Sequence, residues 1–307
     1  MISELMKHIC RFMENPARIF RKFNHTRIQR IIPDEPFLKL MIKARLGYKL
    51  DLDDPKTFNE KLQWIKLYDH NPIYTEMVDK YEAKKIISSS VGCDFVVPTY
   101  GVWDNFKDID FSTLPDQFVL KTTHDCGGVY ICYDKSKFDI TAVRKDIEHR
   151  LSNNFFWQGR EWPYKNVKPR ILAEKLLLSQ CEPIENNSIM DYKIMCFNGE
   201  AKYCLVCSGR HSKEGLHETF FDRFWKPAPF RRNYPTSNIS ISKPLNYELM
   251  INIAEKLSND IPFLRVDFFE VDGTLFVGEL TFFPANGFGA FHPQEWDNRL
   301  GELIQLL

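Results

Sequence analysis

The sequence predicts an α+β protein, because helices and strands follow one another in both halves of the chain without strict alternation. Apolar, β-prone runs separated by Asn-Gly or Asp-Gly pairs predict hairpins. Amphipathic stretches with capping signals predict the helices between them. The 307 residues, 44% of them hydrophobic, suffice for one large or two moderate domains with a core.

The first 56 residues predict a basic helical segment. Residues 1–50 hold 11 Lys and Arg against 4 Asp and Glu, whereas the whole chain has no net charge. Apolar residues such as Ile9 and Phe12 interleave with the cations, as in an interfacial helix drawn to anionic lipid, although Pro16 interrupts the pattern. An alternative of equal weight is a segment that packs on the body of the protein and keeps its basic face in solvent.

No run approaches the ~18 apolar residues of a membrane span, and the N-terminus lacks a signal-peptide pattern. We therefore expect a cytoplasmic protein with peripheral contact at the inner membrane through residues 1–30. Nucleic acid is not an expected partner, since no nucleic-acid module follows the basic segment.

Residues 57–175 are expected to form the first of two lobes. A capping box from Thr57 to Glu60 opens a helix that Asn71-Pro72 ends. A second helix is expected to carry Asp79 and Lys80 and to stop near Gly92. The next elements are expected to be strands and one polar helix, at 100–103, 117–121, 129–133, 140–153 (the helix) and 170–177.

Residues 176–307 are expected to form the second lobe. Asn198-Gly199 predicts a hairpin turn, and a polar, Pro-rich connection covers 229–243. The expected regular elements are strands 192–197 and 201–207, a helix 245–257, a second hairpin and a terminal helix that buries Trp296, Leu300, Ile304 and Leu307.

The second hairpin joins Phe263–Phe269 to Thr274–Leu280. A two-residue Asp-Gly turn would put Asp267 and Glu279 on opposite faces. We expect instead a three-residue loop with Gly273 in the left-handed position of a G1 bulge, pairing 265 with 279 and 267 with 277.

That register would bring Arg265, Asp267, Glu279 and Thr281 to one face. Two acids and a cation on an apolar hairpin are costly to bury unless they pair with one another or bind a ligand or a metal ion. The alternative is an ordinary surface salt-bridge cluster. Neutralising either acid is expected to leave the fold nearly intact, because it relieves repulsion between the carboxylates.

Lys121 ends a predicted strand shortly before Gly127-Gly128. A lysine there can point its ammonium at phosphate while backbone N–H groups approach the same oxygens. An ordinary hairpin turn is the simpler interpretation, and neither a Walker A nor a G-x-G-x-x-G pattern occurs.

Residues 154–170 combine aromatic side chains with cations. Aromatic faces suit sugar rings, and cations suit uronate or other carboxylate groups. We expect acceptor recognition by Trp157, Arg160, Trp162 and Tyr164. Packing of a long loop onto the lobe is the equal alternative.

The order of these features resembles the ATP-grasp ligases over about residues 57–290. Three segments are similar to the TupA-like branch, which is found in pathways for teichuronopeptide and other bacterial surface polysaccharides. These segments are Phe58-Asn59-Glu60-Lys61-Leu62-Gln63-Trp64, Gly159-Arg160-Glu161-Trp162-Pro163-Tyr164-Lys165 and Gly278-Glu279-Leu280-Thr281-Phe282.

The resemblance implies an ATP-grasp fold of two α+β lobes that clamp ATP, and a role for each matching residue. Asp267 and Glu279 would hold Mg²⁺, and Arg265, with Lys121, would steady the transferring phosphoryl group. The family commonly has Asn where this chain has Thr281, which leaves the number of bound Mg²⁺ ions open. The residues implied to contact the nucleotide are Lys80 and Lys121 (phosphates), His124, Gly127 and Gly128 (a lid), Glu174 with backbone groups of Lys175 and Leu176 (adenine), and Asp191 (ribose) with Lys193.

The implied activity is an ATP- and Mg²⁺-dependent carboxylate–amine ligase that works through an acyl phosphate. It would join an amino acid or amine to a uronic acid or peptide substituent of a glycan or glycolipid-linked acceptor. One alternative is a nucleotide-sugar-dependent glycosyltransferase of capsule or O-antigen synthesis, with the two acids holding a metal on the donor diphosphate. Another is a nucleotide-binding protein that has lost turnover.

Overall fold

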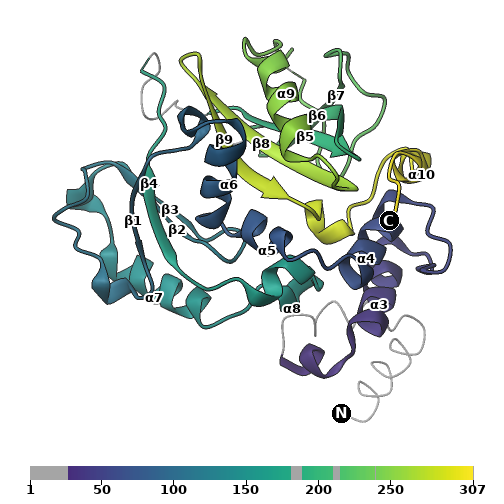
Figure 1. Cartoon of the computed structure of the whole chain (residues 1–307), viewed down its shortest axis with the longest axis horizontal. Coiled ribbons are helices and arrows are strands. Elements are labelled where there is room, and N and C mark those ends of the chain that lie inside the picture. Colours follow the sequence, from purple (N-terminus) through teal and green to yellow (C-terminus); the bar gives the residue numbers. More distant parts are fainter. Residues whose placement is uncertain (1–26, 181–188, 210–214, 239, 307) are drawn as a thin grey trace, which may run out of the picture.

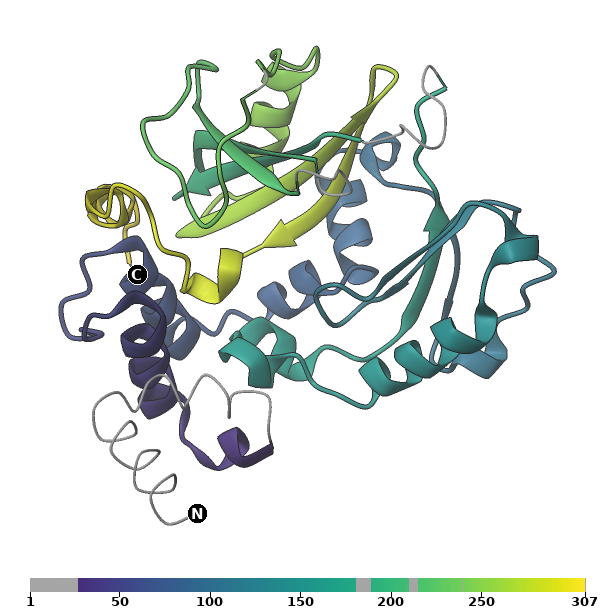
Figure 2. The same ribbon diagram turned by 180° about the vertical axis from the view of Figure 1, so that it is seen from behind.

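The computed structural model describes residues 27–180, 189–209, 215–238 and 240–306. The strands of this part form one four-stranded and one five-stranded sheet, both antiparallel. The sheets lie on opposite sides of the molecule, and α5 (Ile73–Val78) and α6 (Glu82–Val91) lie between them in both views (Figures 1 and 2). The α+β class expected from the sequence is confirmed.

The four-stranded sheet has the order β1-β4-β2-β3. One of its faces carries Phe118, Leu120 and Ala173, which pack with Ile147 of α7 (Ile140–Leu151) in a separate small core. The strands are β1 (Thr99–Trp103), β2 (Phe118–Thr122), β3 (Val129–Cys132) and β4 (Ile171–Lys175).

The five-stranded sheet has the order β7-β6-β5-β8-β9. Its strands are β5 (Asp191–Phe197), β6 (Glu200–Ser208), β7 (His217–Asp222), β8 (Phe263–Val271) and β9 (Thr274–Thr281). Ile194, Val266 and Phe268 on one face belong to the main core, as does Met250 of α9 (Tyr247–Leu257).

All eight strands predicted from the sequence are present, with ends shifted by one or two residues. β7 was not predicted, because its run His217–Asp222 is short and follows a polar stretch.

The helices predicted from capping signals are also present, with two differences. The capping box of Thr57 and Glu60 is formed and opens α4 (Phe58–Tyr68). The expected second helix is two helices: Asp79, Lys80 and Tyr81 form a break between α5 and α6, so the prediction that Asp79 and Lys80 are helical is wrong. The terminal helix α10 (Glu295–Glu302) ends before Ile304, and Leu307 lies outside the described residues.

The break follows from hydrogen bonding. The Asp79 carboxylate accepts from the Tyr81 amide at 2.8 Å, and the Lys80 amide donates to the Thr123 carbonyl at 3.1 Å. An aspartate side chain that accepts from a nearby amide competes with the hydrogen bonds of a helix. The Lys80 amide cannot join a helix either, because it is bound to the loop that follows β2.

The two ends of the described chain pack together. α10 contacts α4, where Asp297 accepts from the Asn59 amide at 3.0 Å and from its side chain at 2.9 Å. The remaining helical elements are η1 (Arg27–Ile31), α3 (Asp34–Leu46), η2 (Cys93–Phe95), η3 (Phe106–Asp108), η4 (Lys135–Lys137), α8 (Phe156–Gly159), η5 (Trp162–Asn166) and η7 (Pro284–Gly287).

The lobe boundaries expected at residues 56 and 175 stay a prediction. α4, α5 and α6 share the main core with the five-stranded sheet, although they precede the first strand in sequence. The expected membrane-contacting segment, residues 1–30, falls largely in 1–26, outside the described residues. Within the described part of the chain, no helix is long and apolar enough to cross a membrane.

Candidate functional site

The turn and the bulge that set the register of the β8–β9 hairpin differ from those predicted from the sequence. Val271 pairs with Thr274, so the turn is the two-residue Asp272-Gly273, with φ of 48° and 77°. The predicted three-residue loop is wrong. Gly278 is the extra residue of a bulge lower down the hairpin, between the pairs Phe268–Val277 and Asp267–Glu279.

Packing explains why the bulge falls at a glycine. A Cβ atom built on Gly278 would lie 2.5 Å from Cε2 of the Phe269 ring. The bulge shifts β9 by one residue, and Asp267 therefore stands directly opposite Glu279, with Arg265 opposite Thr281. The predicted sharing of one face is confirmed, although the partners of Arg265 and Asp267 differ from those expected.

Six polar side chains form one network on this face of the sheet. Asp267 accepts from Arg265 Nε at 2.6 Å and from Arg265 Nη2 at 2.7 Å, and it also pairs with Lys193. Lys193 forms a second ion pair with Asp191 at 2.6 Å. On β9 the Thr281 hydroxyl accepts from Arg265 at 3.1 Å and donates to Glu279 at 3.2 Å.

Burial and charge oppose each other in this network. Burial acts to raise the pKa of Asp267, but the charges of Arg265 and Lys193 outweigh it and hold that pKa below its ordinary value. Burial raises the pKa of Asp191 above its ordinary value, against the charge of Lys193. Asp267 is therefore ionised and firmly paired, which rules out the surface salt-bridge alternative, since Asp267 is 2% exposed.

The donor set fits a metal ion that is bound together with a nucleotide. Mg²⁺ takes carboxylate and phosphate oxygens and usually only one or two protein carboxylates. Asp267 and Glu279 supply two carboxylates side by side. Among the described residues no three His, Cys, Asp or Glu side chains cluster to hold a metal. Phosphate oxygens and water would therefore have to complete the coordination.

The four-stranded sheet presents a second charged group, on the face away from its own core. Glu174 of β4 pairs with Lys121 of β2 and, at 3.0 Å, with Lys84 of α6. Burial acts to raise the pKa of Glu174, but these two lysines lower it overall. The Lys175 amide donates to the Pro98 carbonyl at 2.9 Å, so this predicted adenine contact is already occupied; Leu176 follows the end of the strand.

The same face carries exposed apolar surface on the edge strand. Val129 and Ile131 of β3 stand opposite Lys121 and Val119, and they are 44% and 38% exposed. Apolar surface beside lysines is the composition that a nucleotide's flat base and its phosphates require.

The β2–β3 loop, which was expected to form a lid, is held by hydrogen bonds from Lys80 and His124. Lys80 donates to the Thr122 carbonyl at 3.1 Å and to the Asp125 carbonyl. His124 is buried, with Nε2 3.1 Å from the Arg150 carbonyl, so its ring holds the loop against α7, and its expected nucleotide contact stays a prediction. Arg150 also pairs with Asp125 at 2.9 Å.

The two loop glycines have separate roles. Gly127 has φ of 88°, a left-handed conformation that favours glycine. A Cβ on Gly128 would collide with the Thr122 hydroxyl. Both glycines are therefore needed by the loop itself, and contact with phosphate stays a prediction.

The segment 154–170 is mostly packed into the protein. Arg160 is 1% exposed; its guanidinium pairs with Asp34 at 2.8 Å and donates to the Gln29 carbonyl at 2.6 Å. It also donates to the Trp157 carbonyl at 3.1 Å and lies over the Trp157 ring. Internal partners hold the guanidinium, and the substrate role expected for Arg160 stays a prediction.

The other three predicted acceptor residues differ in exposure. Trp157 and Trp162 are partly exposed, and Trp162 stacks on His70 with the ring centres 4.7 Å apart. Tyr164 is 6% exposed and packs edge-on against Phe155. Packing of the loop, the alternative interpretation, explains most of this segment.

Three charged residues near the site were missed from the sequence: Lys66, Lys84 and Glu161. Lys66 is 2% exposed and donates to the carbonyls of Gly159 and Asn286 at 2.8 and 2.7 Å and to the Gln63 side chain at 2.9 Å. Burial raises the pKa of Glu161 to about 7. Glu161 lies inside the Gly159–Lys165 segment, but the sequence interpretation considered only the aromatic and cationic residues there.

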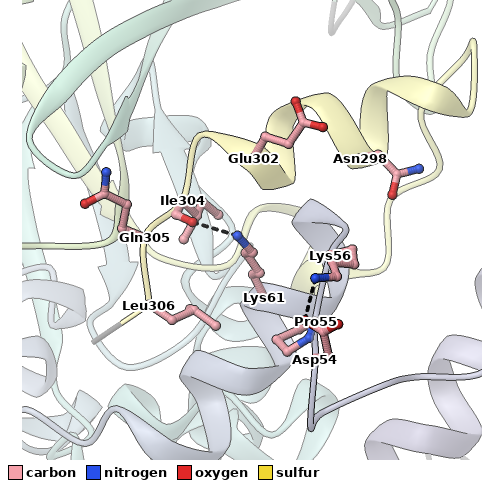
Figure 3. Close-up of a pocket in the computed structure, with 9 residues that line it drawn as sticks. All are labelled: Asp54, Pro55, Lys56, Lys61, Asn298, Glu302, Ile304, Gln305 and Leu306. Atoms are coloured by element: carbon pink, nitrogen blue, oxygen red, sulfur yellow. Dashed lines mark hydrogen bonds and ion pairs between the residues drawn. The ribbon is translucent and has the colours of Figure 1, made fainter.

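A pocket of about 660 Å³ lies elsewhere, between α10 and the approach to α4 (Figure 3). Its lysines are already bound: Lys61 donates to the Ile304 carbonyl at 2.8 Å, and Lys56 pairs with Asp54 at 2.5 Å. None of the residues discussed above as nucleotide or metal contacts lines it.

Comparison with solved structures gives low-identity matches to ATP-grasp enzymes. A D-alanine–D-alanine ligase from Bacillus anthracis complexed with ATP is 16% identical, with a TM-score of 0.37, over 72% of this chain and 55% of that one. An L-amino acid ligase from Bacillus licheniformis is 10% identical, with a TM-score of 0.46, over 84% and 57%. The chain thus spans little more than half the length of these proteins.

No curated protein is similar enough to count as a relative. The family model of the TupA-like ATP-grasp proteins, in contrast, matches residues 60–305, which include both sheets and both charged networks. This match confirms the resemblance seen in the three sequence segments. The chain belongs to the TupA-like family of ATP-grasp proteins.

Proposed function

We propose that the protein is an ATP- and Mg²⁺-dependent carboxylate–amine ligase. The observation that carries this proposal is the Arg265, Asp267 and Glu279 network on the five-stranded sheet of a chain with ATP-grasp family membership. Phosphoryl transfer depends on positioned charge far more than on covalent catalysis, and this network supplies both a buried cation and two carboxylates.

The nucleotide is proposed to lie against the four-stranded sheet. Val129 and Ile131 offer apolar surface to the base, and Lys121 and Lys80 offer ammonium groups to the phosphates. Glu174, now paired with Lys121 and Lys84, can accept from the adenine amino group. Asp191 and Lys193 belong to the network on the five-stranded sheet, and they are proposed to contact the ribose and the phosphates.

The reaction has two steps. A substrate carboxylate oxygen attacks the γ-phosphorus of ATP, the bond to the β-phosphate oxygen breaks, and ADP leaves with an acyl phosphate formed. The amine nitrogen then attacks the acyl carbon, phosphate leaves, and the nitrogen loses a proton as the amide forms. Mg²⁺, when bound, neutralises phosphate charge. Arg265 is placed to steady the transferred group.

The proposed acid is a uronic acid or peptide substituent of a bacterial surface polysaccharide, free or lipid-linked, and the proposed amine is an amino acid. Similarity to the TupA-like branch supports this class of acceptor, and the basic composition of residues 1–50 supports peripheral work at the inner face of the cytoplasmic membrane. The lobes are proposed to divide near residue 175.

Two measurements test the function. Thermal shift with ATP-Mg²⁺ and, separately, with UDP-sugars identifies the nucleotide. Mass spectrometry of a reaction with ATP, a uronate-bearing glycan and pooled amino acids identifies the product, expected as a gain of one amino acid minus water. A hexose increment from a UDP-sugar would support the glycosyltransferase alternative, and ATP binding without ADP release would support the protein that has lost turnover.

A further inference from the structure

A buried carboxylate without a protein partner lies between α8 and η5. Glu161 is 5% exposed, and no described residue donates a hydrogen bond to its side chain or lies within ion-pair distance of it. The hydroxyl of Tyr164, which is 6% exposed, also lacks a partner among the described residues. A buried carboxylate left in this state is costly, and such groups are normally paired.

Both groups keep a small contact with solvent. Some polar atoms of the described residues are fully shielded from solvent and have no hydrogen-bond partner. The carboxylate oxygens of Glu161 and the Tyr164 hydroxyl are not among them. The Glu161 and Tyr164 atoms have no partner either, so each of them must keep some contact with solvent. A ligand that binds them has no protein hydrogen bond of theirs to displace.

The residues that precede Glu161 are anchored to α3 and to the segment that follows β9. The residue before it, Arg160, is anchored to Asp34 at 2.8 Å. The carbonyl of Gly159 is bound by Lys66, which also binds the Asn286 carbonyl just beyond β9. α8 lies beside α5 and η7 in both views (Figures 1 and 2).

Electrostatics agree with this placement. The charges of Lys66, Glu279 and Arg265 all act on Glu161, and those of Glu279 and Glu161 act on Tyr164. The unpartnered carboxylate therefore belongs to the same electrostatic neighbourhood as the proposed metal ligand Glu279.

We propose that Glu161, together with the Tyr164 hydroxyl, binds the ammonium group of the amine substrate. This inference rests on the proposed ligase function and adds the residue that recognises the second substrate. An ammonium offers N–H donors to the two carboxylate oxygens and the phenol oxygen. A metal ion is the other occupant that the charge of Glu161 would suit, and the experiment below separates the two.

The test separates the two half-reactions. ADP formation without amine is measured with ATP-Mg²⁺ and glucuronic or galacturonic acid, and amide formation is then measured against the concentration of the single amino acid that reacts best. Glu161→Gln should raise the KM for this amino acid at least about tenfold and leave amine-free ADP formation unchanged. Tyr164→Phe should raise it less. Glu161→Asp, which keeps the charge, should recover part of the loss.

Glu302→Gln is the matched control, because Glu302 is an exposed acid on α10, far from this segment. An unchanged KM in Glu161→Gln overturns the proposal. So does a higher Mg²⁺ requirement for amine-free ADP formation, which would make Glu161 a metal ligand. Absence of ADP formation by the parent protein with every acid would instead overturn the ligase function itself.

Discussion

At the scale of single residues, Asp267 and Glu279 are not equivalent, although they face each other. Asp267 pairs with two cations, the partly buried Arg265 and the buried Lys193, whereas Glu279 accepts only the Thr281 hydroxyl among the described residues. The expectation that neutralising either acid leaves the fold intact assumed that the two carboxylates mainly repel each other. For Asp267 the structure shows the opposite balance.

We predict that Asp267→Asn destabilises the fold by roughly 3–5 kcal/mol, because it removes the ion-pair partner of Arg265 and one of the two carboxylates that pair with the buried Lys193. Glu279→Gln should change the free energy of unfolding by less than about 1 kcal/mol. Urea denaturation measures both. Equal losses in the two variants would contradict the asymmetry.

Both variants should lose most acyl-phosphate formation, since the γ-phosphate is no longer held and neutralised. Hydroxylamine trapping without an amine substrate measures this step, at a temperature where both variants stay folded. Hydroxamate formed at the parental rate by Glu279→Gln would exclude Glu279 as a metal ligand.

Glu161 makes stability depend on pH. Its pKa is about 7 in the folded protein and about 4.3 when unfolded, so between these values the folded state keeps a proton that the unfolded state loses. Stability should therefore fall as pH rises from about 4.3 to 7, by on the order of 3 kcal/mol. Lys66, Glu279, Arg265 and Tyr164 are the ionisable groups that interact with it.

Glu161→Gln should remove this fall, and the two unfolding curves measured against pH should converge near pH 4. Parallel curves would mean that Glu161 is ionised throughout the range, for instance by pairing with a cation in solution.

At the scale of elements, the β8–β9 hairpin marks how far the sequence can predict the site. Alternation puts Arg265 with Asp267 and Glu279 with Thr281, but whether the two pairs share a face depends on the register, which the sequence interpretation assigned to a three-residue loop. The device that produces the shared face, a bulge at Gly278, depends on the Phe269 ring packed over that glycine, and no local pattern reveals this. Likewise, Arg160 reads as a surface cation until its partner Asp34, more than a hundred residues away, is known.

We predict that Gly278→Ala costs about 1–3 kcal/mol of stability, because its Cβ meets the Phe269 ring. Phe269→Leu in the same chain should recover part of this cost, and a double-mutant cycle measured by urea denaturation gives the coupling. Additive effects would mean that Gly278 is needed for its backbone and not for space.

At the scale of the whole molecule, the charged faces of two sheets are far apart in sequence, and only the family match places both in one nucleotide-binding fold. The class of the fold and all but one strand follow from hydrophobic periodicity and turn residues. The break between α5 and α6 does not, because the Lys80 amide binds the Thr123 carbonyl, which comes much later in the chain.

We predict that Lys121→Ala lowers ATP affinity about 10- to 150-fold, which corresponds to the loss of one charge-assisted contact of roughly 1.5–3 kcal/mol. Lys175→Ala is the matched control, since Lys175 is exposed on the neighbouring strand and is expected to act only through its backbone. Isothermal titration measures both. Equal affinities in the two variants would remove the phosphate role of Lys121.

The single nitrogen atom of Lys66 also bears on how the protein folds. Its partners at Gly159 and Asn286 are 93 and 220 residues away in sequence, so their contacts close very long loops. The ammonium is desolvated only when all its acceptors are in place, which makes this contact a late event. Lys66→Met should therefore speed unfolding and leave the refolding rate nearly unchanged, so that the last step of folding is also the step that completes the segment carrying Glu161.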